Sequence, residues 1–230
     1  MSKFTKKDKI IQEKLDPEKG YSINEAMEIL QSVKSKNFDE SIDISVKLGV
    51  DPNKSDQNVR GAVTLPNSLG KEVIVAVFAD GDNASAAEDA GADFVGMDDL
   101  ADKLTKEEIT VDVVISTNAA MKVVGKLGQV LGPKGLMPNP KTGTVSDDVV
   151  TAIKNVKAGQ VRFRTDKNGI IHGSIGKVSF EADKIKANAS ALLEELKKLK
   201  PASAKGIFIG NIAINSTMGP GIKINSGELV

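Results

Sequence analysis

The hydrophobic pattern of the first third of the chain changes from a helical period to an alternating one. Ser22 and Glu25 have the spacing of a capping box, in which two side chains satisfy backbone N–H groups at the start of a helix. Apolar residues then recur every three or four positions as far as Val33. From Ser41 to Leu48, apolar and polar residues alternate. The pattern predicts a helix followed by a strand with one buried face.

The middle of the chain has the pattern of a parallel sheet with crossover helices. Residues 73–79 (VIVAVFA) are a continuous apolar run, as expected for a strand that is covered on both faces. Strand and helix signals then alternate, which predicts a doubly wound α/β domain. The expected elements are an alanine-rich helix at 84–90, a short strand at 94–95, a polar helix at 98–108, an apolar strand at 111–115 and, after a Gly/Pro-rich segment at 125–143, a helix at 147–157.

The last third returns to the style of the first. Val161 and Phe163 alternate with arginines, and the pair Asn168-Gly169 is a strong hairpin signal, so we expect residues 170–175 to form the returning strand. An amphipathic helix follows, with acidic residues at its start and lysines at its end, as the helix dipole favours. Pro201 ends this helix. The apolar positions of a final strand are Ile207, Ile209, Ile212 and Ile214.

Neither outer piece of the chain can bury its own apolar faces. One helix and one strand before residue 67 need the hairpin, helix and strand after residue 159 to complete a core, and together these elements make an α+β sandwich of the split βαβ kind. We therefore predict a discontinuous domain of residues 1–67 plus 159–230, with residues 68–158 inserted as a second domain. A length of 230 residues suits two domains of ordinary size.

The charge of the chain is zero on average and uneven in detail. Thirty-one basic residues balance thirty-one acidic ones, which by itself counts against a nucleic-acid binder. Residues 68–158 hold nine lysines against fourteen acidic residues, whereas residues 159–230 hold eleven basic residues against six acidic ones. Residues 80–112 alone contain eleven acids and two lysines. We expect the two regions to face different partners, so a protein-interaction scaffold that uses the acidic face stays open as one function.

Composition removes several classes of chemistry. With no cysteine and one histidine, the chain lacks disulfides, thiolate nucleophiles and the usual transition-metal ligands, so we expect neither a metal nor another cofactor. The basic amino terminus is not followed by an apolar run, and no stretch approaches 18 apolar residues. We expect a cytoplasmic protein with no membrane partner.

An α/β enzyme or small-molecule binder that uses the inserted domain is the alternative function. The domain has neither a G-x-G-x-x-G nor a P-loop motif, and the turn after its first strand, Asp80-Gly81-Asp82-Asn83, would repel a phosphate. Around His172 the sequence supplies no evident nucleophile and orienting group. A pair of catalytic carboxylates within residues 80–112 stays open. We predict that the protein is not an enzyme.

Two Gly/Pro-rich segments are the densest signals in the chain. Residues 125–145 carry lysines and no acid, and they are either an ordered surface loop or a surface that meets phosphate through backbone donors and lysines. Residues 215–221 (NSTMGPG) are either a turn after the last strand or a surface for ribose and groove edges. Because aromatic residues make up only 3% of the chain, an RNA partner would be folded rather than splayed on stacked rings.

Four segments resemble the bacterial L-one family of ribosomal proteins, from the mobile side stalk of the large subunit. They are NFDESIDISVKLGVDPNKSDQNVRG, GQVLGPKGLMPNPKTGTV, FRTDKNGIIHGSIGKVSF and STMGPG. The resemblance covers essentially the whole chain, from about Ser22 to Asn225. It implies a discontinuous α+β domain with an inserted Rossmann-like three-layer α/β domain that binds no dinucleotide.

The resemblance also implies a function. In the family, the terminal domain binds a folded element of large-subunit ribosomal RNA, many bacterial members bind and repress their own messenger RNA, and the stalk contacts transfer RNA leaving the exit site. We therefore expect a ribosome-associated structural protein that is a monomer when free. Ser41 stands where a threonine is common in the family, and it keeps the hydroxyl. The RNA-binding residues implied by motif are Phe38, Ser41, Asp166, Lys167, His172, Ser179, Thr217, Met218 and Gly219.

Overall fold

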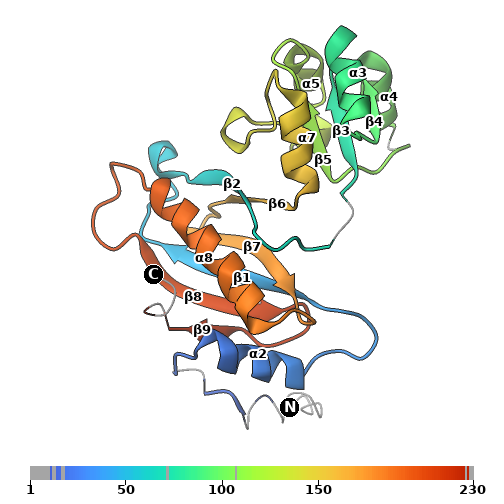
Figure 1. Ribbon diagram of the computed structural model, residues 1–230. Coiled ribbons are helices and arrows are strands. Elements are labelled where there is room, and N and C mark those ends of the chain that lie inside the picture. Colours follow the sequence, from blue (N-terminus) through green and yellow to red (C-terminus); the bar gives the residue numbers. More distant parts are fainter. Residues whose placement is uncertain are drawn as a thin grey trace, which may run out of the picture. The chain divides into compact units, whose positions relative to one another are not determined.

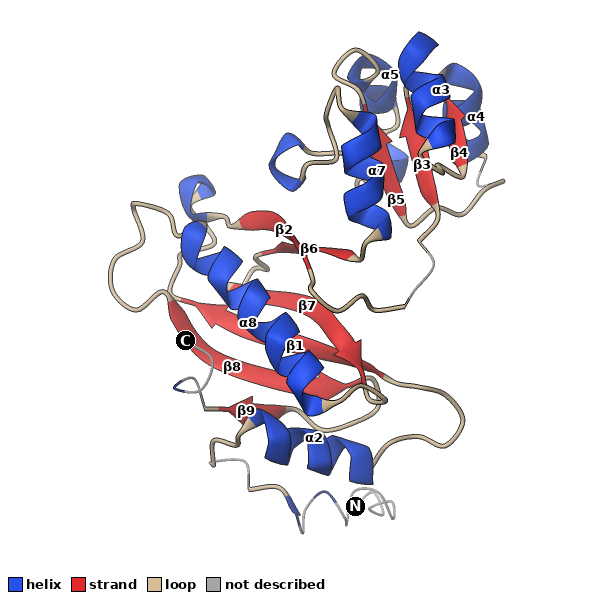
Figure 2. Cartoon of the chain, viewed as in Figure 1, coloured by secondary structure: helices blue, strands red, loops and turns tan. Residues whose placement is uncertain are grey.

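The computed structural model describes residues 11, 14–16, 19–70, 73–106, 108–225 and 227 (Figure 1). The basic segment 1–10, on which the expectation of no secretion signal rests, lies outside these residues. The chain divides into two compact units: unit 1 contains Met1–Leu69 and Val161–Val230, and unit 2 contains Gly70–Gln160. The structure is a mixture of helices, antiparallel strands and a small parallel sheet (Figure 2).

Unit 1 is built on a four-stranded antiparallel sheet. Its order is β7-β1-β8-β9, with β1 at Ser41–Leu48, β7 at Ile170–Lys177, β8 at Ile209–Ser216 and β9 at Ile222–Ile224. In β1, Ile42 and every second residue after it are buried, as the alternation in the sequence predicted. The polar residues between them point to the other face of the sheet. This second face is called the open face below.

Two helices cover the buried face of this sheet. Helix α2, Ile23–Ser32, begins at Ser22 with the predicted capping box, since Ser22 and Glu25 bond each other's backbone N–H groups. Helix α8, Ala182–Lys198, lies across the sheet in Figure 1 and buries Ile185, Leu192 and other residues of the predicted apolar face. The helices, the four-stranded sheet and the small β2-β6 sheet share one hydrophobic core.

The predicted hairpin around Asn168-Gly169 was right in its turn and in one antiparallel bridge, Thr165 to Ile171, and wrong in the pairing of its strands beyond that bridge. The turn forms, since the N–H of Asp166 donates to the carbonyl of Ile170 at 2.9 Å. The strands on its two sides nevertheless enter different sheets: β6, Gln160–Arg164, pairs with β2, Arg60–Thr64, while β7 pairs with β1. Thr165 explains why the chain leaves one sheet for the other at this turn. Its hydroxyl accepts from the N–H of Val59 and donates to the carbonyl of Val59, which directs β6 toward β2.

Unit 2 contains a parallel sheet with helices on both faces. The strand order is β4-β3-β5, with β3 at Val75–Phe78, β4 at Phe94–Gly96 and β5 at Val113–Ser116. All four residues of β3 are buried, as predicted for a strand that is covered twice. Val75 and Val77 pack against two helices, α3 at Gly81–Asp89 and α7 at Val149–Lys157. Ala76 and Phe78 pack against three helices on the other face: α4 at Asp98–Thr105, α5 at Met121–Lys126 and α6 at Gly128–Leu131.

Six short elements were not predicted. Strand β2 follows the short 3-10 helix at Ser55–Gln57, and β9 follows the NSTMGPG segment, which therefore connects β8 to β9. Helices α5 and α6 and the 3-10 helix at Pro140–Thr142 lie within or beside the Gly/Pro-rich segment of unit 2. Ile207 was expected in the final strand, but β8 begins only at Ile209.

Candidate nucleic-acid interface

The connection between β8 and β9 is attached to the first residue of β1. The N–H of Ser41 donates to Oγ1 of Thr217 at 3.1 Å, and the N–H of Thr217 donates to the carbonyl of Ser41 at 3.1 Å. Segments 176 residues apart are thereby held as if they were one more step of the β1-β8 ladder. The predicted residues Ser41 and Thr217 are therefore neighbours.

A buried glutamate organises this end of the sheet. Glu40 is 1% exposed, and its carboxylate accepts from the hydroxyl of Ser216 at 2.5 Å, the N–H of Met218 at 3.2 Å and the N–H of Ser35 at 2.6 Å. Its backbone carbonyl accepts from the N–H of Val178 at 2.9 Å. One residue thus fixes the loop before β1, the connection after β8 and the segment after β7. The sequence gives no signal for it, because a glutamate in a polar loop is usually solvated.

Two large apolar side chains are exposed beside this glutamate. Phe38 is 50% exposed and Met218 is 62% exposed. Next to Phe38, Asp39 accepts from the N–H and the hydroxyl of Ser179, the latter at 2.7 Å, so Ser179 also belongs to this end of the sheet. We call the predicted residues gathered here the turn cluster: Phe38, Ser41, Ser179, Thr217, Met218 and Gly219.

Gly219 is required by space rather than by backbone conformation. A Cβ atom on this residue would lie 2.3 Å from Oγ of Ser216 and 3.1 Å from a methyl group of Leu30. The same Ser216 hydroxyl is the one that donates to Glu40. Any side chain at position 219 would therefore push on the buried hydrogen bond that holds the turn cluster.

The other predicted residues lie further along the open face. Ser45 of β1 is directly opposite His172 of β7, and its Oγ lies 3.2 Å from Nδ1 of the imidazole. Nε2 of the same ring lies 3.5 Å from Oδ2 of Asp166. We call Ser45, His172 and Asp166 the histidine row. Lys167, exposed in the turn after Asp166, adds a positive charge beside it.

Backbone hydrogen bonds set the electrostatics of the histidine row. Oδ1 of Asp166 accepts from the N–H groups of Ile170 and Asn168, each at 2.8 Å. The bond from Ile170 is the largest cause that holds the pKa of Asp166 below its ordinary value, with smaller contributions from Asn168 and His172. Asp166 is therefore a fixed negative charge that orients the imidazole.

The sequence did not indicate that a serine, a histidine and an aspartate lie in a row. Such a row suggests a hydrolase, but its geometry here does not support catalysis. The His172 side chain is 57% exposed and the row stands on an open strand face. The backbone of β1 is paired with a strand on each side, so it has no free N–H group there for an oxyanion. The row therefore holds an exposed imidazole in one orientation.

A polar strip joins the histidine row to the turn cluster. Ser41 and Ser45 are four residues apart, or roughly 13 Å along a strand. Between them Asp43 is opposite Ser174 on β7 and Asn215 on β8. The alternation of β1 could have indicated Asp43 and Ser45, but their partners depend on strand pairing that the sequence pattern does not reveal.

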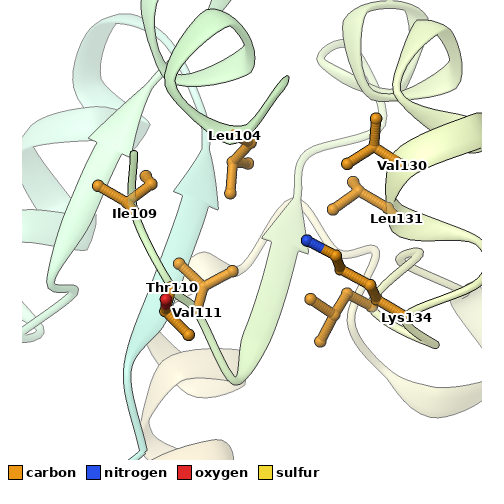
Figure 3. Close-up of a pocket in the computed structure, with 8 residues that line it drawn as sticks. Leu104, Ile109, Thr110, Val111, Val130, Leu131 and Lys134 are labelled. Carbon is orange, nitrogen blue, oxygen red and sulfur yellow. The ribbon is translucent and has the colours of Figure 1, made fainter. Parts of the chain in front are cut away.

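Unit 2 offers a different kind of surface. A hollow of about 210 Å³ is lined by Leu104, Ile109, Thr110, Val111, Val130, Leu131, Lys134 and Leu136. Figure 3 shows these mostly apolar side chains, with the amine of Lys134 pointing into the space. None of the predicted RNA-binding residues lines it. Across the described part of the chain, no cluster of three acidic or histidine side chains could hold a metal ion, and no helix is long and apolar enough to cross a membrane.

The open face carries hydroxyls, amides and a histidine framed by exposed apolar groups, which are the kinds of group that contact folded nucleic acid through shape and hydrogen bonds. The family model described as the ribosomal protein L1p/L10e family matches residues 30–220. The chain belongs to this family, and it is a ribosomal protein, not an enzyme. The family expected from the sequence motifs is thereby confirmed.

Full-length relatives agree with this assignment. The large ribosomal subunit protein uL1 of Saccharophagus degradans is 58% identical over 229 residues, which cover 100% of this chain and 99% of that protein. The proteins of the same name from Pseudoalteromonas atlantica and Methylococcus capsulatus are 56% and 58% identical over 229 residues. Each match covers 100% of this chain and 98% or 99% of the relative.

Proposed function

We propose that this ribosomal protein is a structural component of the large subunit that binds a folded element of its ribosomal RNA through the open face of unit 1. The observation that carries the proposal is the turn cluster, in which a buried glutamate holds exposed apolar and hydroxyl groups in fixed positions. Such preorganised groups suit a rigid RNA surface, because little side-chain freedom is lost on binding.

Most of the predicted residues have a chemical role in this contact. Phe38 and Met218 pack against sugar or base edges, and the hydroxyls of Thr217 and Ser179 keep acceptor capacity for a ribose 2′-hydroxyl. Gly219 leaves room for the Ser216 hydroxyl, whose hydrogen bond to Glu40 holds the turn cluster. Lys167 pairs with a phosphate, and the histidine row presents the imidazole edge-on beside it.

Unit 1 is, in this proposal, a split βαβ sandwich formed by residues 1–67 plus 159–230, and residues 68–158 are an inserted Rossmann-like three-layer domain without a nucleotide. The different surfaces of the two sheets support this division into two domains. Unit 1 has an open polar sheet face, whereas both faces of the unit 2 sheet are covered by helices. The free protein is a monomer. The bound protein is part of the mobile side stalk of the large subunit.

The proposal includes two further partners, messenger RNA and transfer RNA. The protein binds a similar fold in its own messenger RNA and represses its translation, and ribosomal RNA competes for the same open face. On the ribosome it assists release of transfer RNA from the exit site. What supports the first is that a surface reading shape and 2′-hydroxyls accepts any RNA that presents the same fold.

Binding of a large-subunit ribosomal RNA fragment by the full chain tests the proposal. Met218→Ala should weaken specific binding by about 1–3 kcal/mol, because the variant loses most of the apolar side chain that packs against the RNA. Ile74→Ala is the matched control, since Ile74 is an exposed apolar residue of unit 2. Equal affinity of the parent and Met218→Ala, with both variants folded, would show that the turn cluster is not the RNA site.

A further inference from the structure

Three loops meet at the end of the unit 1 sheet opposite to the turn cluster. The N–H of Leu48 donates to the carbonyl of Gly169, and the N–H of Gly49 donates to the carbonyl of Phe208, each at 2.8 Å. The side chain of Gln57 donates to the carbonyl of Ser203 at 3.4 Å. We call segments 49–58, 166–169 and 199–208 the far-end loops.

Buried groups hold the far-end loops in place. Gln57 is 7% exposed, and its carbonyl oxygen accepts from the N–H of Asp51 at 2.8 Å. Phe208 and Ala204 are buried, and Phe208 belongs to the core of unit 1. Lys200 donates to the carbonyl of Gly206 at 3.4 Å, which closes the turn before residue 207. The loops therefore present a built surface.

This surface carries a small excess of positive charge, with four lysines against three aspartates in the far-end loops. Asp51 and Asp56 are the exposed acids of the loops, and Asp166 is occupied by the turn and by His172. Among the described residues, Lys54, Lys167 and Lys205 lie in none of the ion pairs. The exposed lysines at this end of the sheet are Lys47, Lys54, Lys167, Lys200 and Lys205.

The exposure of Ile207 is a second observation that points to a partner at the far-end loops. Its side chain is 83% exposed, more than the other exposed large apolar residues, Met218, Phe38 and Ile74. The polar strip of the open face runs from the turn cluster past the histidine row to Lys47 and Lys167, so both ends of the sheet are reached along one surface. With eight residues, β1 spans roughly 25 Å.

We propose that the far-end loops are a second RNA contact of unit 1, which meets the bound ribosomal RNA beyond the segment that the turn cluster holds. Lys54 and Lys205 pair with phosphates, and Ile207 packs against a sugar or base edge, as Met218 does at the other end. The inference rests on the proposed function. A polyanion fits better than an acidic protein segment, because the far-end loops are attached to the end of β1, the strand that carries the proposed RNA face.

The test uses the full chain and a long large-subunit ribosomal RNA fragment, with affinity measured at several salt concentrations. The double variant Lys54→Gln, Lys205→Gln should reduce the slope of log affinity against log salt by about 0.7–0.9 for each phosphate that a lysine no longer neutralises. The control is the double variant Lys103→Gln, Lys106→Gln, which removes two exposed lysines of unit 2. It makes the same charge change and should leave the slope unaltered. Ile207→Ser should lower affinity several-fold at an unchanged slope.

Met218→Ala separates the two proposals. A weakened Met218→Ala together with parent-like slope and affinity in the far-end variants would overturn the far-end contact and leave the proposed function standing. A parent-like Met218→Ala would instead count against the proposed function. Thermal melting of every variant shows that the loops remain folded. Loss of binding to an acidic protein of the subunit, with RNA binding unaltered, would also overturn the RNA assignment.

Discussion

Strands β1 and β3 show how two sheets in one chain differ in what they can bind. In β1, buried aliphatic residues alternate with exposed or half-exposed polar residues, and helices cover one face of its sheet. In β3 all four residues are buried between two layers of helices. An antiparallel sheet that is covered once leaves a polar face for a partner, whereas a parallel sheet that is covered twice leaves only loops and helix surfaces.

The strongest test of this comparison separates the two units. Residues 1–67 joined to 159–230 by a short linker should fold and keep specific RNA binding, because all the proposed contacts lie in these segments. Residues 68–158 alone should show none. Circular dichroism reports folding, and titration with labelled ribosomal RNA reports binding. Comparable binding by the folded middle segment would show that the open sheet face is not what distinguishes the units.

The second prediction removes the buried anchor of the open face. Glu40→Ala leaves the hydroxyl of Ser216 and the N–H groups of Met218 and Ser35 without their acceptor, at a cost of about 2–4 kcal/mol in unfolding free energy. Specific RNA binding should fall with it. Asp39→Ala is the control, since this carboxylate is exposed and bonds only Ser179 among the described residues. Denaturant titration of both variants measures the difference.

Glu40 also shows where sequence reasoning stops. The alternation in β1 and the capping box of α2 are local patterns, and the structure confirms both. The role of Glu40 depends on Ser216 and Met218, which are more than 170 residues away, and no local pattern encodes that proximity. The wrong hairpin pairing has the same cause. The turn at Asn168-Gly169 is local, but the partner of β6 is β2, about 100 residues earlier.

Predictability of the candidate site was uneven for a related reason. The motifs indicated Thr217, Met218 and Gly219, which share one connection, so the structure brings them together as neighbours in sequence. Ser45 was missed although it is opposite His172, because the register of β1 against β7 is set by packing in the core. Residues that support a site from another strand require the fold.

The third prediction compares two glycines in the same connection. Gly219→Ala would place a Cβ atom 2.3 Å from the Ser216 hydroxyl, whereas a Cβ at Gly221 would meet no atom within 4 Å. Gly219→Ala should weaken specific RNA binding by about 1–3 kcal/mol through displacement of the turn cluster, and Gly221→Ala should have little effect. Binding isotherms at one salt concentration are sufficient. Equal effects of the two variants would mean that general stiffness of the connection, rather than the Ser216 contact, determines affinity.

The smallest predicted effect compares one carboxylate in each unit, half-buried Asp166 and exposed Asp148. The pKa of Asp166 in unit 1 is lowered chiefly by the N–H of Ile170, and the pKa of Asp148 in unit 2 is lowered chiefly by hydrogen bonds with Thr151 at the start of α7. A carboxyl group with a lowered pKa stabilises the fold fully above its ordinary value of 3.8 and loses that contribution as pH falls through the lowered pKa.

Asp166→Asn and Asp148→Asn should therefore each reduce the melting temperature slightly at pH 7. The difference from the parent should shrink below pH 3.8 and disappear only as the pH falls through the lowered pKa. Only Asp166→Asn should also weaken RNA binding at pH 7, because only Asp166 orients His172 on the open face. Thermal melts across pH 2–7 measure the first effect, and RNA titration measures the second. If both variants weaken binding equally, the loss comes from stability alone, and the histidine row has no part in recognition.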